Sequence, residues 1–404
     1  MTTQPTRFAH PIVFLFLIVP FGAMGGYLTV AVAYQLTQAG VSVEEVAALV
    51  AVSYVPQTWK FLWAPIADIT LSRKRWYALG AVVSALGIFA TGVVQPDAKS
   101  LPLLYAAVLV SNVAATFLAM ATESLMVYNT PPESKGRASG WFQAGNLGGN
   151  GLGGGAALWL VQTLPDPWMA GAALAVVCAL CAVALRFVPE PPPMLRTGHY
   201  GRMFVAVLKD LWQVARLRAG ILALLICFLP IGSGAASNLW AAVADDWHAT
   251  AGTVALVTGV LSGIVSAIGC VAGGYGSDRL DRKTAYALYG LLMAVCAVAM
   301  ALAPRTKSMY VVFTLVYAFI QGLTYAGFTA VVLEVIGPGA AATKYNVFAS
   351  LSNMPIAYMT LVDGWAHQRW GAAGLLNIEA AMGVIGIIVF VAVAITMTRR
   401  RSAA

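Results

Sequence analysis

The sequence predicts an all-α polytopic membrane protein whose twelve transmembrane helices form two pseudo-symmetric six-helix bundles. Three observations carry this prediction: the composition, apolar runs that recur at the length of a bilayer crossing, and an internal repeat. Of the 404 residues, 60% are hydrophobic and only 10% are charged, and the mean hydropathy is +0.78. Soluble domains carry about a quarter charged residues, so a soluble enzyme is excluded. Outer-membrane barrels are excluded as well, because they show short alternating segments instead.

Apolar runs of about 20 residues, the length that crosses a bilayer as a helix, follow one another along the chain. We expect the twelve spans at residues 11–37, 44–67, 76–95, 102–127, 138–163, 168–188, 219–243, 251–275, 284–303, 309–335, 344–366 and 371–396. The long connection between the sixth and seventh spans opens with a proline run and continues as a basic, amphipathic stretch, which we expect on the membrane surface. The expected domains are an N-terminal bundle at 1–188, a cytoplasmic connector at 189–218 and a C-terminal bundle at 219–404.

The distribution of positive charge predicts the orientation. With these spans, 19 of the 24 Lys and Arg residues lie on the side of both termini, and only Lys99, Arg305, Lys307 and Arg369 lie on the opposite side. Positively charged loops face the cytoplasm, so we expect both termini there and the protein in a bacterial inner membrane. The net charge of +8 is thereby explained without a nucleic-acid partner.

The two halves of the sequence also repeat. Four landmarks recur at nearly the same offset: Pro20 as Pro230, Asp68 as Asp278, Glu123 as Glu334, and Tyr77 as Tyr286. One shared offset at four places predicts parallel repeats related by an axis along the membrane normal.

Residues 274–283, Gly-Tyr-Gly-Ser-Asp-Arg-Leu-Asp-Arg-Lys, closely resemble the loop signature of the major facilitator superfamily, from which only Asp281 departs. A degenerate copy starts at Ala64. The resemblance covers essentially the whole chain and implies the major facilitator fold and transport by alternating access. Lipid headgroups would explain the arginines here but not the paired aspartates, which can latch helix ends together. The expected gate latch consists of Asp68, Arg73, Asp278, Arg279, Arg282 and Glu334.

A narrower resemblance appears at Lys60-Phe-Leu-Trp-Ala-Pro65, which is similar to a segment of the peptide–acetyl-coenzyme A transporter branch. That branch includes the AmpG-type muropeptide permeases, and residues 131–138 resemble its following loop. The resemblance implies proton-coupled import of an amphipathic, anionic, sugar- or peptide-containing solute such as a muropeptide. A siderophore importer of the same branch and a drug-type exporter are the alternatives.

Lys60 has no twin, because its counterpart in the second half is Cys270. A lysine inside a span is costly unless it faces water or an acid, so it either binds an anionic group of the solute or forms a structural ion pair with Glu123 or Asp68. Uncharged polar residues form stripes at helical spacing and predict either a wet path or hydrogen bonds between helices. The expected solute-binding set is Lys60, Tyr27, Tyr34, Asn112, Thr116, Gln143, Asn146, Asn150, Trp240, Gln321, Tyr325 and Asn353.

Proton coupling would need a carboxylate, since no histidine lies in the middle of a span. Glu123 is the first candidate, and Glu334, Glu379 and Asp363 are weaker ones. The five cysteines lie in apolar runs, and no cluster of His, Cys and carboxylate residues suggests a metal, a cofactor or catalysis. We therefore expect no cofactor, no enzyme activity and a monomer whose partners are a small-molecule solute, the lipid bilayer and protons. The alternatives from other functional classes are a membrane enzyme and a receptor that binds a ligand without transporting it.

Overall fold

The computed structural model describes residues 8–41, 43–94, 99–191, 200–240, 243–336 and 341–402, and these residues fold almost entirely into helices. The helices before the connector are α1 (Val13–Gly26), α2 (Ala33–Gln38), α3 (Val43–Trp59), α4 (Ala64–Ile69), α5 (Arg73–Val93), α6 (Leu101–Asn129), α7 (Lys135–Gly151), α8 (Ala157–Thr163) and α9 (Trp168–Cys181). Short π or 3-10 segments continue several of them, among them Tyr27–Val32, Lys60–Leu62, Leu152–Ala156 and Ala182–Phe187.

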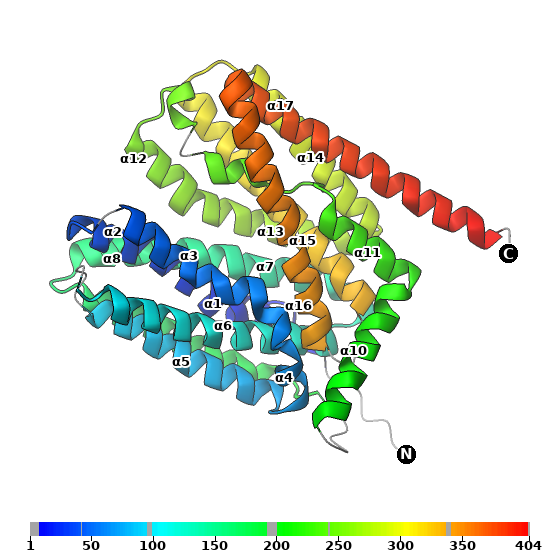
Figure 1. Ribbon diagram of the computed structural model, residues 1–404, viewed down its shortest axis with the longest axis horizontal. Helices are drawn as coiled ribbons and strands as arrows, with labels where there is room; N and C mark the ends of the chain where they lie inside the picture. Colours follow the sequence, from blue (N-terminus) through cyan, green and yellow to red (C-terminus); the bar gives the residue numbers. More distant parts are fainter. Residues whose placement is uncertain are drawn as a thin grey trace.

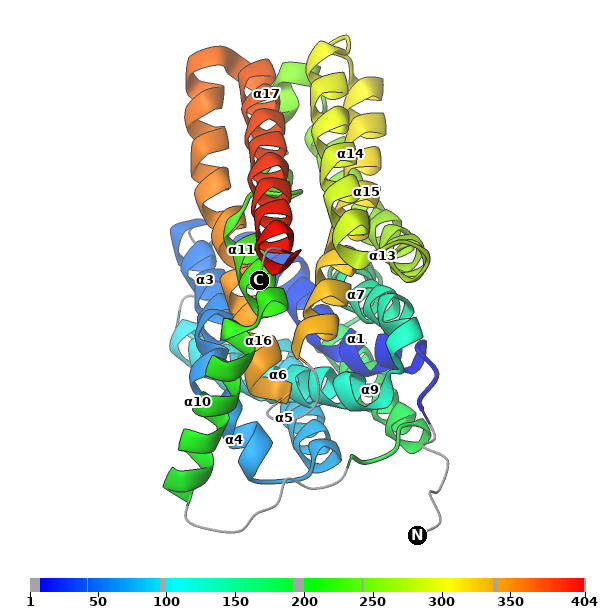
Figure 2. The same ribbon diagram turned by 90° about the vertical axis from the view of Figure 1, so that its right-hand side faces the viewer.

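The connector and the second half supply α10 (Tyr200–Arg216), α11 (Arg218–Phe228), α12 (Ala251–Val254), α13 (Ser262–Arg279), α14 (Arg282–Leu302), α15 (Lys307–Ile336), α16 (Ala341–Leu351) and α17 (Asn353–Ser402). In Figure 1 the first-half helices fill the lower part of the molecule and most second-half helices the upper part, while α16 reaches down beside α6 and α10. The helices α4 and α10 and the C-terminal end of α17 lie toward the same end of the molecule, the right-hand end in this view. Figure 2 looks at that end directly.

Eight stretches of the described residues are long and apolar enough to cross a membrane, or nine if the bent pair Phe204–Arg216 and Gly220–Phe228 counts as one. They cover every predicted span except 44–67, 138–163 and 219–243. Residues 44–67 are helical but are divided by the 3-10 segment Lys60–Leu62. Residues 138–163 are helical but are glycine-rich and divided by the π segment Leu152–Ala156. The last stretch, Ala341–Thr396, contains two of the predicted spans.

The prediction of one continuous helix over 219–243 is wrong. α11 ends at Phe228, and the chain resumes as a 3-10 segment at Ala235–Leu239. Pro230 lacks the N–H group that a helix needs, and Gly232 and Gly234 adopt left-handed φ angles of 56° and 71°. Helical structure is therefore lost in the middle of the predicted span. Similarly, Gly371 with φ of 64° divides α17 into two helices.

The internal repeat appears as equivalent hydrogen bonds in the two halves. The hydroxyl group of Tyr77 on α5 donates to the carbonyl oxygen of Leu17 on α1 at 3.0 Å. The hydroxyl group of Tyr286 on α14 donates to the carbonyl oxygen of Ile231, beyond α11, at 2.9 Å. Both tyrosines are buried, so each bond satisfies a polar group that would otherwise be costly inside the protein.

The connector helix α10 is amphipathic, as the sequence predicts. Val207 and Val214 are buried against the protein, whereas Leu208 and Trp212 are exposed. Asp210 forms an ion pair of 3.1 Å with the buried Lys344 of α16. The proline-rich part of the connector at 192–199 lies outside the described residues.

Candidate gate and transport path

One gate contact is centred on Asp278 at the C-terminal end of α13. Its Oδ1 accepts a hydrogen bond from the backbone N–H of Gly136 at 2.7 Å, and its Oδ2 accepts one from the backbone N–H of Arg137 at 2.9 Å. The Arg137 side chain also pairs with Oδ2 at 3.0 Å. The first N–H groups of a helix have no partner within the helix and attract negative charge. Asp278, from the second half, therefore caps α7 of the first half.

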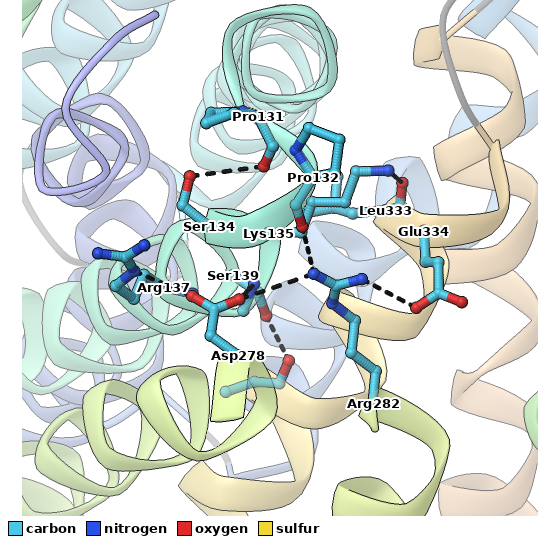
Figure 3. A network of polar contacts seen from close by, with 12 residues as sticks. Pro131, Pro132, Ser134, Lys135, Arg137, Ser139, Asp278, Arg282, Leu333 and Glu334 are labelled. Carbon is cyan, nitrogen blue, oxygen red and sulfur yellow. Dashed lines mark hydrogen bonds and ion pairs between the residues drawn. The ribbon is translucent and has the colours of Figure 1, made fainter. Parts of the chain in front are cut away.

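Arg282 extends this contact to α15, as Figure 3 shows. Its guanidinium lies 3.0 Å from Glu334 and 3.7 Å from Asp278, and it donates to the carbonyl oxygen of Pro132. Lys135 at the start of α7 donates to the carbonyl oxygen of Leu333 at 2.8 Å. The ends of α7, α13, α14 and α15 are thus joined in one polar network.

The second gate contact is the counterpart in the other half. Asp68 at the end of α4 accepts hydrogen bonds from the backbone N–H groups of Ala342 at 3.2 Å and Thr343 at 2.9 Å. The Thr343 hydroxyl donates to the same carboxylate at 2.8 Å. Asp68 is buried and caps α16, so the first half holds the second half by the same device.

The two other predicted latch arginines, Arg73 and Arg279, have different surroundings. The Nε of Arg73 lies 3.4 Å from the Ser124 hydroxyl, and its guanidinium lies 5.0 Å from the centre of the Tyr128 ring. Its positive charge also acts on the Asp68 carboxylate. The Arg279 side chain is exposed, and among the described residues no acid lies within ion-pair distance of it. The contacts between the halves at these two places are therefore made by the two aspartates and Arg282, together with Lys135 and Arg137.

Lys60 and Glu123 form a buried ion pair of 3.6 Å between the 3-10 segment after α3 and helix α6. The other oxygen of Glu123 accepts a hydrogen bond from the Asn346 amide of α16 at 2.8 Å. Lys60 is thus held by the acid that the sequence offers as its structural partner. Because Asn346 belongs to the second half, this cluster also joins the halves.

Gln143 and Asn146 lie where the two halves meet. The Gln143 amide donates to the Thr329 hydroxyl of α15 at 2.7 Å, and Asn146 donates to Gln143 at 3.1 Å. Nearby, the Ser139 hydroxyl donates to the carbonyl oxygen of Ala326. Hydrogen bonds between helices therefore account for this part of the predicted polar stripe.

The other predicted solute-binding residues are spread over several environments. In the first half, Thr116 accepts a hydrogen bond from Trp63 at 3.0 Å, and Asn112 donates to its own helix at Val108. Gln321 of α15 donates to Ser237 at 3.2 Å. The remaining members divide into buried Tyr27 and Trp240, half-buried Tyr325, and exposed Tyr34, Asn150 and Asn353.

A surface hollow of about 370 Å³ lies beside the Asp278 gate contact, lined by residues that include His10, Arg137, Trp141 and Tyr275. Most of the predicted solute-binding set lies elsewhere, so this hollow is separate from the expected path. Sequence reasoning also missed Thr343 and the pairing of Lys344 with Asp210. Lys344 was counted only as a positive charge near the cytoplasm, because its acidic partner is 134 positions away in sequence.

The model of the Major Facilitator Superfamily matches residues 12–360. The chain belongs to this superfamily. A search of curated protein sequences found no match. Solved structures of similar fold include the human organic anion transporter MFSD10 (TETRAN), with TM-score 0.70, 16% identity, and coverage of 96% of this chain and 100% of that one.

Two sugar symporters are also similar in structure. The E. coli fucose:proton symporter FucP has TM-score 0.73 and 16% identity over 95% of this chain and 98% of that one. The proton:xylose symporter XylE has TM-score 0.66 and 13% identity over 94% of each chain. At this level of identity the likeness shows the fold, which confirms the predicted major facilitator architecture. The chain is a multi-pass membrane transporter of this superfamily and not an enzyme.

Proposed function

We propose that the protein moves a solute by rocking residues 1–188 against residues 219–404, and that the two capping contacts close one side. The observation that carries this proposal is their reciprocity: Asp68 caps α16 while Asp278 caps α7. Both contacts lie between the halves, and both would break if the halves separated at that end. The positive-inside distribution of Lys and Arg makes this the cytoplasmic end, with both termini in the cytoplasm of a bacterial cell.

The solute that fits best is amphipathic and anionic, with sugar or peptide groups, such as a muropeptide. Lys60 is the buried cation that would receive its negative group, and Glu123 holds that place while no solute is present. A proton on Glu123 would cancel the negative charge and free Lys60 for the solute. We therefore propose proton-coupled import with Glu123 as the coupling group.

Protonation of Glu123 would also affect the contact between the halves near Asp68. Glu123 accepts a hydrogen bond from Asn346 on α16, the helix that Asp68 caps. A neutral carboxyl group is a weaker acceptor than a carboxylate, so protonation would loosen this link between the halves. Binding of a proton and a solute near Glu123 would in this way favour opening at the cytoplasmic end.

Solute counterflow in proteoliposomes with labelled anhydro-muropeptide tests the proposal. We expect Lys60→Ala to lower the uptake by at least about tenfold, the effect of losing one hydrogen bond to a charged group. Lys99→Ala, an exposed lysine in a loop, is the matched control and should transport like the wild type. Glu123→Gln should retain counterflow but lose the response to an inward proton gradient.

The alternatives give different results in the same assay. A siderophore importer would ignore muropeptide but take up a labelled siderophore in a Lys60-dependent manner. A drug-type exporter would move many hydrophobic cations and be indifferent to Lys60→Ala. Failure of the wild-type protein to move any solute would refute the transport mechanism as a whole.

A further inference from the structure

A second pair of acids lies far from Lys60, in the hairpin formed by the two parts of α17. Asp363 lies eight residues before the bend at Gly371, and Glu379 lies eight residues after it. A helix rises 1.5 Å per residue, so both acids lie about 12 Å from the bend. The hairpin therefore brings the two carboxyl groups to the same depth, and they interact electrostatically.

Both acids are withdrawn from solvent. Asp363 is 0% exposed, Glu379 is 5% exposed, and neither oxygen of Asp363 has a hydrogen-bond partner among the described residues. One oxygen of Glu379 accepts a hydrogen bond from the Tyr317 hydroxyl of α15, and the other has no such partner. Both oxygens of Asp363 are thus without a hydrogen-bond partner, while Glu379 also faces the Ser233 hydroxyl and the backbone of Ala235 and Ala236.

The surroundings of the pair contain no compensating positive charge. Among the described residues, no Lys, Arg or His lies within ion-pair distance of either acid. The groups that face Glu379 are Tyr317, Ser233, the backbone of Ala235 and Ala236, and the thiol of Cys296. Tyr317 also interacts with Asp363. All of these groups are neutral in their ordinary protonation state.

A buried hydroxyl group close to Tyr317 also lacks a hydrogen-bond partner among the described residues. Thr314 lies one turn before Tyr317 on the same face of α15, is fully buried, and has no hydrogen-bond partner for its hydroxyl group within the described part of the chain. At the end toward the bend, His367 lies one turn after Asp363 and contacts the exposed Asp246 at 2.9 Å. A titratable group therefore lies between the pair and water.

Two adjacent carboxylates without a cation are not stable in a buried site within a membrane protein. A divalent metal does not fit, because the described residues hold no group of three or more His, Cys, Asp or Glu side chains. A single positive charge does fit, and a proton needs no further ligands. We propose that Asp363 and Glu379 share one proton and form an ion-binding site separate from Glu123.

This site deepens the proposed transport function by adding a second place where protonation can occur, within the second half alone. The shared proton would lie between the two helices of α17, with the Tyr317 hydroxyl donating to the carboxyl group of Glu379. Release of the proton would leave two negative charges facing each other, so the α17 hairpin would have to rearrange. Proton release and movement of the second half are thereby linked.

The test needs no solute. Purified protein in proteoliposomes is taken through steps of pH and followed by infrared difference spectroscopy, in which a protonated carboxyl group gives a C=O band that disappears when the proton leaves. The variants are Asp363→Asn, Glu379→Gln and the double variant, all close in volume to the natural residues. All of them, and the reference protein, carry Glu123→Gln so that Glu123 gives no band. Asp245→Asn, an exposed acid in the loop before α12, is the matched control in the same background. Gel filtration and thermal unfolding check that each variant is folded.

In sodium-free buffer we expect the reference protein and Asp245→Asn to show the same band and the double variant to lose it. Each single variant should lose its band at a pH different from the reference protein, because the proton is no longer shared. Absence of the band in the reference protein, or its persistence in the double variant, would overturn the proposal. So would unchanged titration in both single variants, which is decisive even if the double variant does not fold.

Sodium chloride added at constant pH distinguishes the two monovalent cations. A sodium-induced difference spectrum that the double variant lacks would replace the proton by a sodium ion and overturn the proposal in its stated form. No solute is present in any of these measurements. Their outcome is therefore independent of whether muropeptide is the transported substrate.

Discussion

The two gate contacts share one device and differ in everything around it. Asp68 and Asp278 each cap the N-terminal end of a helix in the opposite half. Around Asp278, the side chains of Arg137 and Arg282 add ion pairs that are partly open to solvent. Around Asp68, the Thr343 hydroxyl donates a third hydrogen bond, and the charge of Arg73 acts on the carboxylate. The feature that repeats is the bond to backbone N–H groups, and the arginine ion pairs are an addition in one copy.

The two copies of the family signature make different contacts in this chain. In the first copy, the guanidinium of Arg73 lies over the Tyr128 ring, and its charge acts on Asp68 without an ion pair like those of Arg137 and Arg282. The degenerate copy still closes, because a carboxylate and two backbone donors suffice. The helix cap is therefore the contact that both halves share, whereas close ion pairs are added at the Asp278 contact.

Asp68→Ala is expected to have the largest effect. It removes three buried hydrogen bonds to a charged group and should weaken the contact by about 3 kcal/mol. Hydrogen exchange at the amides of Ala342 and Thr343 should rise by about a hundredfold. Asp278→Ala should raise exchange at the start of α7 less, because Lys135 still holds Leu333 there. An equal effect of the two substitutions would show that the surrounding ion pairs matter as much as the cap.

Gly140→Ala tests the close packing of α7 against α13 next to the Asp278 contact. A Cβ atom at this position would lie 2.6 Å from the Cys270 carbonyl oxygen on α13, so α7 and α13 must move apart. We expect the closed state to lose about 2 kcal/mol, measured as faster exchange at the amides of Gly136 and Arg137. Gly252→Ala has open space around its Cβ and is the matched control. Exchange that stays at the wild-type rate in Gly140→Ala would mean that the gate does not depend on close helix contact.

Arg282→Ala should have the smallest effect, about 1 kcal/mol, because its partner Glu334 is partly exposed and such ion pairs are weak in water. The exchange rates at the start of α7 should rise slightly, and salt should reduce the difference between variant and wild type. Arg73→Ala is the counterpart in the other half and should leave the amides of Ala342 and Thr343 unchanged. Faster exchange at those amides in Arg73→Ala would show that this arginine contributes to the Asp68 gate contact.

The architecture could be predicted because the lengths of the apolar runs and the internal repeat can both be recognised in the sequence without knowledge of contacts. The break in 219–243 could have been predicted as well, since Pro230 is followed by Gly232 and Gly234. The gate aspartates were identified from their motif, but their partners were not, because backbone N–H groups carry no residue signature. Asp363 and Glu379 were weak candidates for a similar reason, since only the bend at Gly371 brings them together.

The composition of the gate has a consequence for how the protein tolerates sequence drift. Each contact depends on one specific side chain on one side and on the main chain on the other. Positions 136, 137, 342 and 343 supply N–H groups whatever residue they carry, and only proline would remove them. Two of these positions are more restricted: a Cβ atom at Gly136 would lie 2.7 Å from the Asp278 carboxylate, and the Thr343 hydroxyl itself donates to Asp68. Asp68 and Asp278 each allow no replacement of equal strength. The strictest sequence constraint on closure therefore falls on the two aspartates and on Gly136.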